Sequence, residues 1–211
     1  SDVMKFHRNL TARFECKELM ILEEGRCLDY LGMEISKRLV KGGEEISLTM
    51  AAYTRKMLEF LKVDNTHHSM NSVDCSHKDK MTSHDDDEVS LDYADRKVFM
   101  TGLGMLGWLV SCIRGDLAYT YSMIASDMAN PTKLSMKGLI WAARYIKGTS
   151  TYRGVTKRDM NTSTSQWRHF TDSDQGKDQS TVNKGKARCG QISLANGMPV
   201  FYKSKATSVA M

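Results

Sequence analysis

The sequence of 211 residues lacks a membrane-spanning hydrophobic run, a signal peptide and any closely spaced pair of cysteines. Its longest apolar run, "VFMTGLGMLGWLVSCI", is too short to cross a bilayer and is rich in glycine, so it predicts a buried helix. The N-terminus, "SDVMKFHRNL", has no apolar core of the kind that a secretory signal needs. Five scattered cysteines without a CxxC pair favour free thiols in a reducing compartment. We therefore expect an intracellular protein, cytoplasmic or nuclear, without a membrane partner.

The charge of the chain is unevenly distributed. With 41% hydrophobic and 26% charged residues, the composition is that of a folded chain of one or two domains. The net charge is +5, but residues 63–96 hold nine acids and three bases, a local charge of −6 that leaves +11 for the rest. The histidines and Cys75 of this acidic segment match no spacing of zinc ligands. A basic body interrupted by an acidic segment predicts a phosphate-facing surface and an exposed linker.

Periodicity in the first half predicts a helix, a β-hairpin and further helices. Residues 4–14 have helical composition, and "CLDYLGMEIS" and "EEISLTM" alternate around "KGG" as a hairpin does. A helix should follow, ending near Lys62, with Tyr53, Met57, Phe60 and Leu61 on its buried face. A long apolar helix should run from about residue 95 to "IRGDL", and a second from about residue 117 to 128.

The second half predicts one more helix and three strands. An Asn130-Pro131 cap should start the helix, and Gly148 should end it in the left-handed conformation. "SQWRHFTD", "CGQISL" and "PVFYKS" predict antiparallel strands, the last two joined by a type I′ turn at Asn196-Gly197. Three strands make a thin, one-sided layer that needs a cover, and we expect the chain to end before it supplies one.

The third of the helices after the acidic segment has a basic face. Lys133, Lys137, Arg144 and Lys147 fall within an arc of roughly 80°, opposite Met136, Leu139, Ala142, Ala143 and Ile146. Residues 132–158 hold seven bases, no acid and three interleaved aromatic residues. A solvated helix face ordinarily mixes both signs of charge, so this stripe favours contact with a polyphosphate. The pattern leaves a merely solvated face as the alternative.

The stretch "HFTDSDQGKD" places three carboxylates within seven residues. Counted from Asp172, its glycine and its twelfth residue are wrong for an EF-hand calcium loop. We interpret Asp174 and Asp178 as caps of a polar turn. Asp172 follows a strand and is a candidate corner of a two-metal site, which would need carboxylates from other elements as well.

Six motifs in this order resemble the copia-type LTR retrotransposon Pol polyprotein, from the end of its reverse transcriptase into its ribonuclease H. They are "YLGMEI" (30–35), "ISLTMAAYTRKMLEFL" (46–61), "GLGMLGWLVSCIRGDLAY" (102–119), "MANPTK…AARYIKGT" (128–149), "TDSDQGKD" (171–178) and "FYKSKATSVAM" (201–211). The resemblance implies an α+β fold: a reverse-transcriptase palm-end β-hairpin and helical thumb, followed by a truncated ribonuclease H-like antiparallel sheet. The implied parts are a palm end with a primer-grip-like hairpin (1–62), an acidic linker (63–92), a helical thumb or connection (93–160) and the truncated ribonuclease H-like domain (161–211).

The same resemblance implies roles for individual residues. Leu31, Gly32 and Met33 match the hairpin that grips the primer, where glycine lets the backbone approach nucleic acid closely. The basic helix would extend the track of the duplex through Lys133, Lys137, Arg144 and Lys147. Asp172 matches the first metal-binding carboxylate of ribonuclease H and is the candidate catalytic residue. The implied partners are an RNA/DNA hybrid or template-primer duplex and the rest of the Pol polyprotein.

The family's other catalytic carboxylates would lie before Ser1 and after Met211. We therefore expect no complete active site and no catalysis by this chain alone. Mg²⁺ or Mn²⁺ would bind only if the ribonuclease H site were completed. Inside the matched region Met50, Gly115 and Gln175 replace the family's glutamine, proline and tryptophan. Two alternatives stay open: a decayed retrotransposon remnant with no binding role, and a nuclease completed by another chain.

Overall fold

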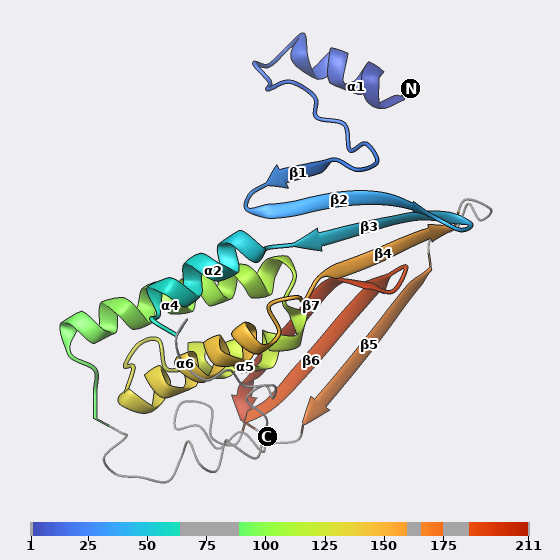
Figure 1. Cartoon of the computed structure of the whole chain (residues 1–211). Helices are drawn as coiled ribbons and strands as arrows, with labels where there is room; N and C mark the ends of the chain where they lie inside the picture. The colour runs from blue at the N-terminus through green and yellow to red at the C-terminus, as the bar shows by residue number, and fades with distance from the viewer. Residues whose placement is uncertain (1, 64–88, 160–165, 175–185, 211) are drawn as a thin grey trace.

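The computed structural model describes residues 2–63, 89–159, 166–174 and 186–210, which form five α-helices and two antiparallel sheets (Figure 1). The expected α+β class is confirmed. Residues 64–88, with the histidines and Cys75 of the acidic segment, lie outside the described residues, as do Gln175 and Asp178. Among the described residues, no helix is long and apolar enough to cross a membrane.

The first sheet has four strands in the order β1 (Cys27–Tyr30), β2 (Met33–Val40), β3 (Gly43–Thr49) and β4 (Gly154–Asp159). The predicted hairpin is confirmed as β2 and β3, which turn at Gly42 (φ +87°). The single strand expected through residues 27–36 is wrong, because the chain reverses at Leu31 and Gly32, whose φ angles are +54° and +79°. The sequence did not predict β4, which returns from after the helices to pair with β3.

The helices form the hydrophobic core. They are α2 (Ala51–Phe60), α4 (Tyr93–Cys112), α5 (Ala118–Ala125) and α6 (Lys133–Gly148), with a short 3-10 helix, η2 (Gly115–Leu117), before α5. The apolar run is α4, as predicted, and it buries Phe99, Leu106 and Leu109 completely. Gly102 lets α4 approach its neighbours, because a Cβ there would lie 2.8 Å from Leu61 Cδ2 and 3.0 Å from Leu139 Cδ2. A fifth helix, α1 (Asp2–Thr11), buries none of its residues and lies apart from this core in Figure 1.

Several predicted helix details are wrong. Thr132, not Asn130, caps α6, because its side chain accepts a hydrogen bond from Ser135 N. Gly148 stays helical and is followed by Thr149 at φ −118°, so no left-handed glycine ends the helix. Met57 and Leu61 are buried as predicted, but Phe60 is 39% exposed, because α2 turns Thr54 and Leu58 inward as well. The second helix is shorter than expected and takes a 3-10 turn first.

The second sheet has the order β5 (Trp167–Asp174), β6 (Lys186–Ala195) and β7 (Met198–Ala210). The predicted turn at Asn196 and Gly197 is confirmed, with φ angles of +48° and +85°. Helix α5 and η2 pack against β7, so the chain itself covers one face of this sheet, contrary to expectation. Strands β4 and β7 lie side by side in Figure 1, and Gly154 faces Met198 where the two sheets meet.

A buried arginine joins β6 to α5. Arg188 is 6% exposed, its Nη1 donates to Ser122 Oγ at 2.6 Å, and its guanidinium lies 5.6 Å from the ring centroid of Tyr119. This contact holds the second sheet against the helices.

Candidate nucleic-acid interface

Helix α6 separates its apolar and basic residues as the sequence predicts. Leu139, Ala142, Ala143 and Ile146 are buried in the core, and Met136 packs against it. The four basic residues differ in exposure: Lys133 and Lys137 are exposed, whereas Arg144 and Lys147 are half-buried. The two exposed lysines are one helical turn apart and form the most accessible part of the stripe.

Hydrogen bonds fix the N-terminal end of α6. Thr132 and Ser135 form a reciprocal capping box, and Ser135 Oγ also donates to Asp127 Oδ2 at 2.9 Å. Lys133 N donates to Val89 O at 3.0 Å, which ties the helix to the segment that precedes α4. The backbone that carries the exposed Lys133 is therefore held in place by hydrogen bonds.

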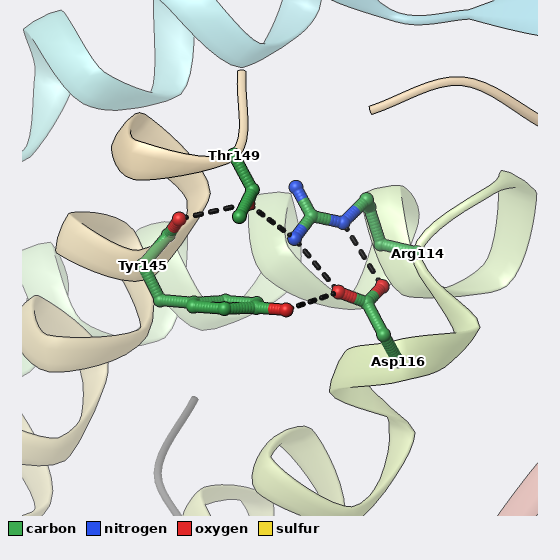
Figure 2. Close-up of polar contacts among 4 residues, drawn as sticks. All are labelled: Arg114, Asp116, Tyr145 and Thr149. Atoms are coloured by element: carbon green, nitrogen blue, oxygen red, sulfur yellow. Dashed lines mark hydrogen bonds and ion pairs between the residues drawn. The ribbon is translucent and has the colours of Figure 1, made fainter. Parts of the chain in front are cut away.

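A buried ion pair fixes the C-terminal end of α6 (Figure 2). Arg114 Nε and Nη2 donate to Asp116 Oδ1 and Oδ2 at 3.0 and 2.8 Å. Arg114 Nη2 also donates to Thr149 Oγ1 at 2.8 Å, and Tyr145 OH donates to Asp116 Oδ2 at 3.1 Å. Because Tyr145 and Thr149 belong to the end of α6, the pair locks that end to the turn that begins η2.

Aromatic rings complete this arginine site. The Arg114 side chain is 3% exposed, and its guanidinium lies 5.3 Å from the ring centroid of Tyr145 and 4.9 Å from that of Tyr152. Burial raises the pKa of both tyrosines, and the Asp116 carboxylate raises the pKa of each further. Their hydroxyls therefore stay protonated well above neutral pH. The sequence predicts only a junction between helices at "IRGDL", and this network could not be predicted from it because nothing local shows what faces the arginine.

Lys157, another base of residues 132–158, does not lie on α6. Lys157 lies on β4, where its Nζ is 3.8 Å from Glu45 Oε2. Glu45 is 4% exposed, and its Oε1 also forms an ion pair with Arg38 Nη2 at 2.6 Å. Lys157 is thus balanced by a carboxylate of the sheet.

The primer-grip-like residues occupy the tight turn between β1 and β2. Leu31 is 59% exposed, and Gly32 N donates to Asp29 Oδ1 at 3.3 Å. Met33 packs against the core instead, and Tyr53 of α2 lies close to Gly32. The accessible part of this element is the backbone around Leu31 and Gly32.

Asp172 is exposed near the end of β5, opposite Gly190 of β6. Its Oδ1 accepts a hydrogen bond from Ser173 N at 2.9 Å. Asp172 and Asp116 line one groove between the second sheet and the start of α5. The two oxygens of Asp116 already accept hydrogen bonds from Arg114 and Tyr145. Within the residues that the structure describes, no group of three or more His, Cys, Asp or Glu side chains could hold a metal ion. These residues therefore do not fit a two-metal centre, which needs several converging carboxylates.

No family model, no curated protein and no solved structure matches this chain. Its functional assignment consequently depends on the residues and geometry described above.

Proposed function

We propose that this chain is part of a copia-type reverse transcriptase and ribonuclease H polyprotein and that it holds an RNA/DNA duplex by its sugar-phosphate backbone. It performs this role without catalysing a reaction by itself. The observation that carries the proposal is α6, whose outward residues include four bases and no acid while its opposite face is locked in the core.

The geometry of α6 suits phosphate contacts that do not depend on sequence. Lys133 and Lys137 are four residues apart, so their Cα atoms are separated by about 6 Å along the helix axis. Two ammonium groups at such a spacing attract a polyanion and release its counterions on binding. Because both ends of α6 are fixed by hydrogen bonds, little ordering of the backbone remains to be done when the ligand arrives.

The order of elements supports the family proposal. A hairpin, a group of helices and an antiparallel sheet follow one another along the chain, as the six motifs imply. The turn at Leu31 and Gly32 is a second candidate contact, since Leu31 is exposed and glycine lets the backbone approach the duplex closely.

The test is fluorescence anisotropy with a labelled RNA/DNA hybrid over a salt series. Changing Lys133→Gln together with Lys137→Gln should weaken binding and lower the slope of log affinity against log salt by about 1.8, from about 0.9 for each lost phosphate contact. The matched control is Lys5→Gln with Lys41→Gln, which removes two exposed lysines from α1 and from the β2–β3 turn and should leave the slope unchanged. Equal slopes for the two double variants would refute the role of the stripe.

The same samples separate the alternatives. Adding Mg²⁺ or Mn²⁺ should not produce RNA cleavage by this chain. Cleavage would favour a working nuclease, and absence of hybrid binding at low salt would favour a decayed remnant with no binding role.

A further inference from the structure

The outer face of the second sheet, on the side away from α5, is exposed. The strand register places side chains from all three strands on this face. They form three rows: His169, Ser193 and Phe201; then Thr171, Gln191 and Lys203; then Ser173, Cys189 and Lys205, with Trp167 beside the first row. Of these, all but Ser193 are exposed. We call these residues the outer sheet face.

One end of the outer sheet face is aromatic. Trp167 is 59% exposed and stacks on His169, with ring centroids 6.5 Å apart and an angle of 13° between the rings. His169 Nδ1 is 2.7 Å from Ser193 Oγ, which holds the imidazole in place. Phe201 lies on the far side of Ser193 and is 49% exposed. Flat rings are thus presented to solvent from both edge strands, and exposed aromatic faces are where unpaired bases stack.

The other end of the outer sheet face is basic and polar. Lys203 and Lys205 follow Phe201 on the same side of β7, at intervals of about 7 Å along the strand. Together with Thr171, Gln191 and Cys189 they line a shallow groove that crosses the three strands. Asp172 stands at the rim of this groove and is the single carboxylate among its described lining residues.

We infer that the outer sheet face binds single-stranded nucleic acid, with bases stacked on Trp167 and Phe201 and the backbone phosphates near Lys203 and Lys205. Aromatic residues on an open sheet with lysines beside them combine the two interactions that unpaired strands require, base stacking and charge neutralisation. A duplex cannot use this face in the same way because its bases are already stacked. The two lysines disfavour a protein partner, because lysine is depleted at protein–protein interfaces, where its ammonium group loses water.

This inference goes beyond the proposed function, since it concerns a different surface and a different form of the ligand. The stripe on α6 would contact a duplex, whereas the outer sheet face would contact an unpaired strand. An experiment can therefore contradict binding at one of these surfaces without contradicting binding at the other.

The first experiment is a thiol footprint on the wild-type chain. Cys189 lies in the groove and is exposed, and Cys27, exposed on β1 of the other sheet, is its internal control. An unlabelled oligothymidylate should slow alkylation of Cys189, read by peptide mass spectrometry, at least fivefold and leave the rate at Cys27 unchanged. Equal rates at Cys189 with and without the oligonucleotide would overturn the inference.

The second experiment measures affinity for the same single strand. Trp167→Ala with Phe201→Ala should weaken binding by at least tenfold, because losing one stacked base costs about 5- to 150-fold. Phe170→Ala is the matched control, since Phe170 is 54% exposed on the same strand but on its opposite face. Equal effects of the aromatic double variant and the control would also overturn the inference.

The lysines provide a test that leaves the aromatic residues in place. Lys203→Gln with Lys205→Gln should lower the salt slope for the single strand by about 1.4, from about 0.7 per contact. The same change should leave the salt slope for the RNA/DNA hybrid unchanged, whereas the α6 double variant should do the reverse. A lysine variant that alters only hybrid binding would assign this face to the duplex and refute the inference.

Discussion

Replacing Asp116 with alanine should destabilise the fold, because it leaves the guanidinium of Arg114 buried without its carboxylate. Arg114 is 3% exposed and cannot regain water without opening the structure. The change removes three hydrogen bonds, of 3.0 and 2.8 Å from Arg114 and 3.1 Å from Tyr145. Removing one partner of a buried ion pair costs about 3–5 kcal/mol. Asp116 is 25% exposed and Thr149 still accepts one bond, so we expect a loss of about 3 kcal/mol, at the lower end.

The assay is thermal and urea unfolding of purified variants. For a chain of this size a loss of about 3 kcal/mol corresponds to a Tm lower by about 6–12 °C. The control is Glu23→Ala, which breaks the exposed pair with Arg26 and should cost less than about 1 kcal/mol. Arg114→Met combined with Asp116→Ala should be less destabilising than Asp116→Ala alone, because no charge is then left buried. The reasoning is refuted if Asp116→Ala costs no more than Glu23→Ala.

Two further predictions concern Tyr202. Gly115→Ala should cost about 1–3 kcal/mol, measured by urea unfolding, because the new Cβ would lie 2.7 Å from Tyr202 Cδ1. A double-mutant cycle with Tyr202→Ala should show part of that cost relieved; additive effects would contradict the clash. Burial also raises the pKa of Tyr202, and of Tyr53, Tyr145 and Tyr152, in the folded state. A pKa that is higher in the folded state means that the folded state keeps these hydroxyls protonated more strongly than the unfolded state does. The free energy of unfolding should therefore be constant below the ordinary tyrosine pKa of about 10 and fall as the pH rises above it. Tyr202→Phe should reduce this alkaline loss, and an unchanged dependence of unfolding free energy on pH would refute the assignment.

Local patterns were enough to predict the elements whose information lies in neighbouring residues. Asn196 and Gly197 both tolerate positive φ, so the turn between β6 and β7 follows from two residues. The buried face of α6 follows from helical spacing, because residues three and four apart lie on one side of a helix. The spacing of Trp167 and His169 places both on one face of β5, which the alternation along a strand predicts. Which residues of β6 and β7 lie beside them depends on the strand register, which the sequence does not give.

The features that the sequence does not predict depend on contacts between residues far apart in the chain. β4 pairs with β3 across more than a hundred residues. Its alternation of polar and apolar residues is hidden by Lys157 and Arg158, which lie opposite Glu45 and Glu44 of β3. The cap of α6 was misplaced because Asn130-Pro131 is a plausible start, yet Thr132 also finds Ser135 for a reciprocal box. Asp172 illustrates the same limit, since a strand-end carboxylate indicates a metal site only where others converge on it.

The three residues from Arg114 to Asp116 connect the two proposed binding surfaces. Arg114 and Asp116 hold Tyr145 and Thr149 at the end of α6, and Gly115 between them packs against the ring of Tyr202 on β7. The basic helix and the second sheet therefore both contact one short, partly buried turn. A larger residue at position 115 would clash with Tyr202 of the sheet, and loss of the ion pair would weaken the contacts with Tyr145 and Thr149 at one end of the helix. This turn and the contact of Arg188 with α5 together set the relative position of the two surfaces, which decides whether one nucleic acid with a duplex part and an unpaired part could occupy both.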